Sequence, residues 1–156
     1  MMSTVTTQRK ELHVQRKQIE RLLGQLAELL EDIADADTDS SWGWSAVPAD
    51  GVADRVADLS GRLQTLFFLE ESDDGLAELL ELQPELRDEL EGLHGEHPWL
   101  LGLLEEVHEL AGSSVRPAST WDDVESRFHR FQRALSGHQR RHDDLGERVS
   151  VDMVSQ

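Results

Sequence analysis

The sequence predicts an all-α protein that folds as an antiparallel, up-down-up-down bundle of four helices. Two observations favour this fold: apolar residues recur at spacings of three and four in four separate segments, and no alternating run of β-branched residues indicates a strand. The expected helices cover about residues 8–36, 50–81, 84–112 and 121–149. A chain of 156 residues suits a single domain, here 1–156, and four such helices pack most simply as a bundle.

The first helix is indicated by a seam of apolar residues with spacings of four and three. The seam residues are Leu12, Ile19, Leu23, Leu26, Leu30 and Ile33. Arg16 interrupts this seam. The segment that follows is rich in Asp, Ser, Gly and Pro, which is typical of a connection. We expect its Trp42 and Trp44 to fold back and cap the bundle, and a partner-binding surface is the alternative.

The second helix has Asp50 as its predicted N-cap, and Glu70 interrupts its seam. The apolar seam residues are Val52, Val56, Leu59, Leu63, Leu66 and Ala77. The third helix begins at Pro84, where the missing N–H costs little. Pro98 should kink this helix near residue 94, and His94 is expected at the surface or the kink because it lies off the seam.

The seam of the third helix is interrupted by His97. Its apolar members are Leu86, Leu90, Leu93, Leu100, Leu104, Val107 and Ala111. In the fourth helix, Thr120 and Asp123 resemble a capping box. The apolar seam residues there are Val124, Phe128, Phe131, Leu135 and Leu145, and the polar exceptions are His138 and His142.

These seam exceptions form a predicted polar layer. It consists of Arg16, Glu70, His97, His138 and His142. In an up-down-up-down bundle they fall at the same end, and a rise of about 1.5 Å per residue allows them to share one layer. Asp143, five residues after His138, lies close enough to it in angle around the predicted helix to point partly inward. Buried groups of this kind must satisfy one another or hold an ion, and carboxylate with imidazole suits iron, zinc or manganese.

Residues along all four predicted helices resemble the hemerythrin-like family, also called HHE cation-binding domains. The matching segments are QRKQIERLLGQL (15–26), LFFLEE (66–71), QPELRDELEGLHGEHPWLL (83–101) and HQRRHDD (138–144). In that family, a non-haem di-iron centre is held by residues from all four helices. They are a histidine on the first helix, HFxxEE on the second, His-x3-His on the third and His-x4-Asp/Glu on the fourth. The centre carries oxygen or senses oxygen or iron. The resemblance covers nearly the whole chain and implies a hemerythrin-like bundle.

The chain departs from this family pattern at three histidine positions, which hold Arg16, Leu66 and Leu93. The resemblance implies that four ligands are retained, namely Glu70, His97, His138 and Asp143. It therefore implies one bound metal ion, iron first and zinc or manganese next, rather than an oxygen-carrying di-iron site. His142 is a further ligand candidate as an i,i+4 partner of His138, and His13 is another if the register of the first helix slips.

A metal-free bundle is the alternative interpretation. In it, Arg16 pairs with Glu70 and supplies the positive charge of the lost metal, because a planar guanidinium binds a carboxylate bidentately. The domain would then be a structural or interaction module with a protein partner that the sequence does not identify. No Gly-rich phosphate loop or flanked nucleophile is present, so we expect no catalytic residues and no enzyme.

Composition adds expectations about partners and location. Asp and Glu number 32 against 15 Lys and Arg, which gives a formal net charge of −17, and there is no Cys. This charge opposes binding to nucleic acid and to anionic membranes. The lack of Cys excludes disulfides and zinc–thiolate sites. With no membrane-spanning run and no secretory signal, we expect a cytoplasmic monomer or small homo-oligomer.

Overall fold

A computed structural model of the chain describes residues 2–38, 47–72, 81, 83–112 and 118–155. Within these ranges the regular elements are helices and no strand occurs, so the all-α prediction is confirmed. None of the described helices is both long enough and apolar enough to cross a membrane.

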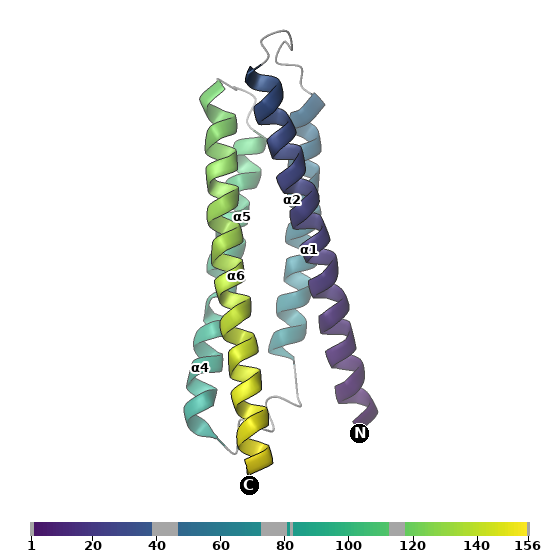
Figure 1. Cartoon of the computed structure of the whole chain (residues 1–156), viewed down its shortest axis with the longest axis vertical. Coiled ribbons are helices and arrows are strands. Elements are labelled where there is room, and N and C mark those ends of the chain that lie inside the picture. Colours follow the sequence, from purple (N-terminus) through teal and green to yellow (C-terminus); the bar gives the residue numbers. More distant parts are fainter. Residues whose placement is uncertain (1, 39–46, 73–80, 82, 113–117, 156) are drawn as a thin grey trace.

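The helices lie side by side along the long axis of the molecule (Figure 1). Helix α1 spans Met2–Thr38 and α2 spans Val47–Glu71. Helix α4 spans Pro84–Gly95, α5 spans His97–Ala111 and α6 spans Ala118–Ser155. In Figure 1 the chain passes up through α1, down through α2, up through α4 and then α5, and down through α6. The two termini therefore lie at the same end.

Two predicted N-caps are wrong. Helix α2 begins at Val47, so Asp50 lies inside the helix; Pro48 falls in its first turn, where a missing N–H has no intrahelical partner to lose. Helix α6 begins at Ala118, so Thr120 is not its cap. Alanine has the highest helix propensity, which favours this earlier start.

Several predictions fall on residues outside the described part of the chain. Helix α2 ends at Glu71, and the expected continuation to residue 81 crosses residues 73–80, which are not described. Ala77, Trp42 and Trp44 also lie outside the described residues.

The predicted kink at Pro98 is a break between α4 and α5, centred on Glu96 rather than on residue 94. Glu96 keeps helical dihedrals (φ −77°, ψ −17°), and its N–H donates to the carbonyl of Leu93 at 3.1 Å. Pro98 has no N–H to donate to the carbonyl of His94. The next turn resumes with Leu100 donating to the Glu96 carbonyl at 3.0 Å.

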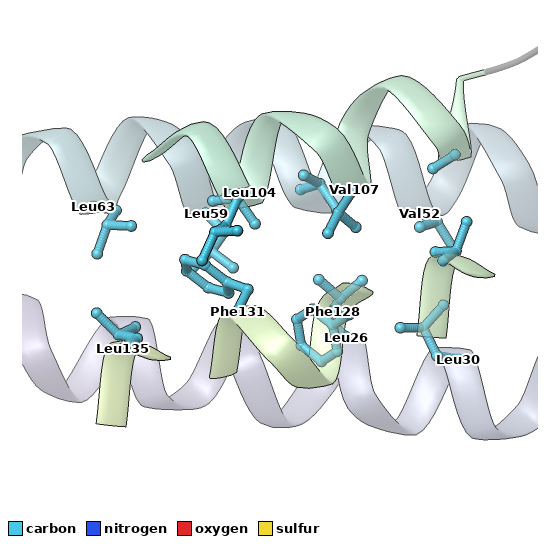
Figure 2. Close-up of a cluster of buried hydrophobic side chains, with 14 of the residues drawn as sticks. Leu26, Leu30, Val52, Leu59, Leu63, Leu104, Val107, Phe128, Phe131 and Leu135 are labelled. Atoms are coloured by element: carbon cyan, nitrogen blue, oxygen red, sulfur yellow. The ribbon is translucent and has the colours of Figure 1, made fainter. Parts of the chain in front are cut away.

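The hydrophobic core follows the predicted seams. Among the described seam residues, Leu12, Leu23 and Leu86 are half-buried, and the other apolar members are buried. Figure 2 shows side chains of α1, α2, α5 and α6 meeting in this core, with Phe131 directed towards Leu59 and Leu104. Burial of this apolar surface is the main force holding the helices together.

We expect Phe131→Ala to lower the free energy of unfolding by about 3–5 kcal/mol, because it removes a fully buried ring and leaves a cavity. Phe68→Ala is the matched control: its side chain is 67% exposed, so its effect should stay within about 0.5 kcal/mol. Urea unfolding followed by circular dichroism measures both. Equal losses in the two variants would contradict the assigned core.

Candidate metal centre

Three helices each bring one polar side chain into the buried interior. Glu70 lies in the last turn of α2, His97 is the first residue of α5, and His138 lies within α6. Each occupies a seam position, so the apolar residues around it in sequence turn it inward. Their exposed fractions are 2%, 3% and 0%.

These three side chains converge on one carboxylate oxygen. Oε2 of Glu70 lies 3.0 Å from Nε2 of His97 and 3.7 Å from Nε2 of His138. One ligand atom of each residue lies within 4.8 Å of the other two. Carboxylate and imidazole together suit a borderline divalent ion such as iron, zinc or manganese. Three of the four predicted ligands are therefore brought together.

The far nitrogen of each histidine faces a second carboxylate. Nδ1 of His97 contacts Oε1 of Glu71 at 3.0 Å, and Nδ1 of His138 lies 3.6 Å from Oε1 of Glu96. The Glu71 carboxylate, at hydrogen-bond distance, can hold the ring proton of His97 on Nδ1 and leave the lone pair on Nε2. Phe67 also stacks on the His97 ring at a centroid distance of 3.8 Å, which fixes the plane of the imidazole.

Sequence reasoning missed Glu71 and Glu96 because both lie off the apolar seams. The available signal was adjacency, since each is the direct neighbour of a predicted ligand. Glu96 is held in turn by Arg141, whose Nη2 donates to its other oxygen at 2.7 Å.

His94 was expected at the surface or at the kink, and it lies beside the break between α4 and α5 rather than on the exposed surface. This residue is half-buried, and its ring centroid lies 5.4 Å from that of His97. Helical residues three apart share a face, so the i,i+3 spacing from His97 was the signal that could have placed it. His142 is also half-buried, with its centroid 6.5 Å from those of His94 and His138.

Arg16 pairs with Asp143 and not with Glu70, which corrects the predicted ion pair. Its Nη1 donates to Oδ1 of Asp143 at 2.6 Å, and the two side chains are 24% and 56% exposed. Asp143 lies one residue beyond His142, about 100° further around the helix, so it faces outward. A pair with this exposure contributes about 0.2–1 kcal/mol.

The remaining candidates lie away from the three-residue group. Asp143 is outside it, and His13 is exposed on α1. Leu66 and Leu93 are both buried in hydrophobic clusters. Their side chains offer no ligand atom.

The buried charges of the site control one another. Burial alone would raise the pKa of Glu70, but polar contacts from His138 and His97 outweigh burial and lower it from 4.5 to about 2. Burial alone would lower the pKa of His97, but Glu70 and Glu71 together raise it above its usual 6.5. In the metal-free protein, the site therefore favours an anionic Glu70 beside an imidazolium.

Comparisons of the chain with protein-family models, with curated proteins and with solved structures found no match. The chemistry of the site must therefore be argued from its own geometry. What the structure defines is an all-α protein with a buried Glu–His–His group of a composition that could bind a metal ion.

We expect the Glu70–His97 pair to stabilise the metal-free protein most between about pH 4.5 and 6.5. The pKa of Glu70 is lowered by folding, so its contribution to the free energy of unfolding is present above pH 4.5. This contribution is lost as the pH falls towards about 2. The pKa of His97 is raised by folding, so its contribution to the free energy of unfolding is present below pH 6.5. This contribution is lost as the pH rises through the folded-state pKa.

The measurement is the difference in unfolding free energy between the wild type and Glu70→Gln, in chelator, from pH 3 to pH 9. The difference should peak in the stated window at about 1.5–3 kcal/mol, the range for hydrogen bonds to charged groups. A difference that does not change with pH would contradict the charged pair.

Proposed function

We propose that this chain is a hemerythrin-like four-helix bundle that binds or senses one metal ion, with Glu70, His97 and His138 as ligands. Iron is the first choice, and zinc or manganese are the alternatives. The observation that carries the proposal is the convergence of three buried ligand atoms, from three different helices, within 4.8 Å of one another. The family assignment is supported by the motif resemblance and by the order of ligands along the chain.

Unpaired atoms in the site support a cation as the missing partner. Oε1 of Glu70 and both ring nitrogens of His138 are buried and make no hydrogen bond within the described part of the chain. Leaving such atoms unpaired costs about 1–3 kcal/mol each. An ion bound by Glu70 and the two Nε2 atoms would satisfy Nε2 of His138.

Different residues would bind the ion and orient its ligands. His97 and His138 present Nε2. Glu71 contacts Nδ1 of His97 at 3.0 Å and orients that ring, while Glu96 lies 3.6 Å from Nδ1 of His138 without a hydrogen bond. A bound ion would supply positive charge beside Glu70 and further coordination positions, because three protein ligands do not complete a tetrahedral shell. Oxygen carriage at two irons is not proposed, since two family histidine positions hold buried leucines, Leu66 and Leu93.

A metal-free interaction or structural module remains the second candidate, and one observation favours it. Both ring nitrogens of His97 contact carboxylate oxygens at 3.0 Å, so an imidazolium can occupy the site without an ion. In this alternative the layer is held by Glu70 with His97 and by Arg16 with Asp143. The partner would be a protein of unknown identity.

We expect the wild type, purified without a metal-affinity tag, to hold iron, zinc or manganese, or to bind Fe(II) under anaerobic conditions. His138→Ala should weaken binding at this site by more than about 100-fold, because losing a ligand exceeds the usual effect of an outer-shell change. Elemental analysis and Co(II) titration, followed by its visible absorption, measure the loss. The control is His129→Ala, an exposed histidine on the same helix. A wild type that binds no metal would favour the metal-free module.

We expect Glu71→Ala to weaken metal binding by about 10–100-fold, because it removes the carboxylate that orients His97. Glu71→Gln should recover part of the affinity, since its amide oxygen can still accept the Nδ1 proton. The control is Glu105→Ala, an exposed glutamate on α5. If both alanine variants kept wild-type affinity in the Co(II) titration, the orienting role would be wrong.

A further inference from the structure

Helix α4 packs separately from the main hydrophobic core. In the described part of the chain, that core draws its residues from α1, α2, α5 and α6, and none from α4. Leu90 and Leu93 of α4 instead form a small cluster with Leu145 of α6, and the half-buried Leu86 packs against it. A unit with few buried apolar contacts opens at a lower free energy than the core of the same protein. Helix α4 can therefore detach while the main core stays intact.

The junction between α4 and α5 supplies a hinge for such a movement. The N–H of Glu96 donates to the carbonyl of Leu93, only three residues back, at 3.1 Å. Pro98 contributes no N–H to the helical hydrogen bonds that would join the two helices. Beyond the junction, the apolar side of α5 is buried in the main core. A rotation at Glu96 would thus move α4 and leave α5 in place.

An open groove lies between α4 and α6. Its volume is about 870 Å³, and its lining residues lie between Glu89 and Glu96 on one side and between Arg141 and Arg148 on the other. Gly92 of α4 contributes no side chain, and a Cβ there would meet no other atom within 4 Å. The two helices are therefore not closely packed across this face.

Two ion pairs bridge the groove. Near the junction, Nη2 of Arg141 donates to Oε2 of Glu96 at 2.7 Å. Further along α4, Arg148 donates to both carboxylate oxygens of Glu89. The side chains of Arg148 and Glu89 are 51% and 49% exposed, and a pair with this exposure contributes little to stability. It can hold α4 against α6 and still break readily.

The last turn of α4 covers the candidate metal centre. In Figure 1, α4 stands at the end of the bundle where the two chain termini lie. The ring centroid of His94 lies 5.4 Å from that of His97, and the His94 ring stacks with His142 of α6 at 6.5 Å. Nε2 of His94 and Nε2 of His142 are both shielded from solvent. Movement of α4 away from α6 would separate these two rings and admit water beside His97.

We propose that α4 is a hinged lid over the metal centre. The Arg141–Glu96 pair anchors the hinge end of the lid to α6, and the Arg148–Glu89 pair latches the moving helix. A metal ion reaches or leaves its three ligands when the lid opens. The inference rests on the proposed metal site and adds to it the element that controls exchange of the ion with solvent.

The first test is the rate at which excess chelator removes Co(II) from the full chain, followed by its visible absorption. Glu89→Gln should speed release by about 1.5–5-fold, because it removes an ion pair of this exposure from the closed lid. The control is Glu106→Gln, which breaks an exposed ion pair of the same kind between α5 and α6, with Arg127. The control should release Co(II) at the wild-type rate.

The second test locks the lid shut. The chain contains no Cys, so a short bismaleimide will react only with introduced thiols, here Glu89→Cys with Arg148→Cys. Crosslinking this double variant should slow Co(II) release by about tenfold or more relative to the same variant without the linker, since release then needs a rarer, more global opening. The matched control is the crosslinked pair Glu106→Cys with Arg127→Cys, which should not slow release.

Amide hydrogen exchange of the metal-free full chain gives a readout that needs no ion. Amides of residues 84–95 should exchange faster than those of α5, and the lid crosslink should slow them. Exchange of α4 only together with α5, or Co(II) release that the lid crosslink leaves unchanged, would overturn the lid. A wild type that binds no Co(II) would instead overturn the proposed function, and hydrogen exchange would still show whether α4 opens, so the two failures are distinguishable.

Discussion

The polar interior is organised around the contact between the buried Glu70 carboxylate and His97. Its charge must be compensated by the groups around it. A carboxylate that is 2% exposed loses nearly all its hydration, and such a charge is tolerated only with a compensating charge and hydrogen bonds. Stability alone does not demand this arrangement, because a well-packed apolar side chain would satisfy the same position at equal or lower free energy. Stability alone therefore does not explain why a charged group is buried among the helices at this position.

The break between α4 and α5 fixes how that interior is built. Pro98 removes one helical hydrogen bond, and the chain turns at Glu96 between two of the histidines. Glu96 thereby lies within 3.6 Å of Nδ1 of His138, on a different helix. His94 stays on the inner side of α4, close to His97. One proline thus influences the position of His97 and of Glu96, the carboxylate that faces His138.

The helical period predicted the apolar core and the inward direction of Glu70, His97 and His138, because both depend only on the position of a residue along its own helix. Partner choice between helices depends on side-chain reach and axial offset, which the period does not encode. For this reason Arg16 was expected to form an ion pair with Glu70, and it forms one with Asp143 instead. The carboxylates at the Nδ1 atoms were missed for the same reason, since they lie off the seams and become relevant only when two helices are placed together.

Both interpretations of the site follow from one electrostatic fact. Glu70, Glu71 and Glu96 place three carboxylates around His97 and His138, within 3.0–3.7 Å of ring nitrogens. This arrangement requires positive charge, which can come from protons on the imidazoles or from a bound cation. A proton on Nε2 of His97 and a metal ion compete for the same lone pair, so the two states exclude each other at that atom. The carboxylates at Nδ1 favour either state, since they stabilise an imidazolium and also a ring polarised by a metal. The geometry therefore selects positive charge at this place, and the affinity of the ion relative to the proton decides which form the protein adopts.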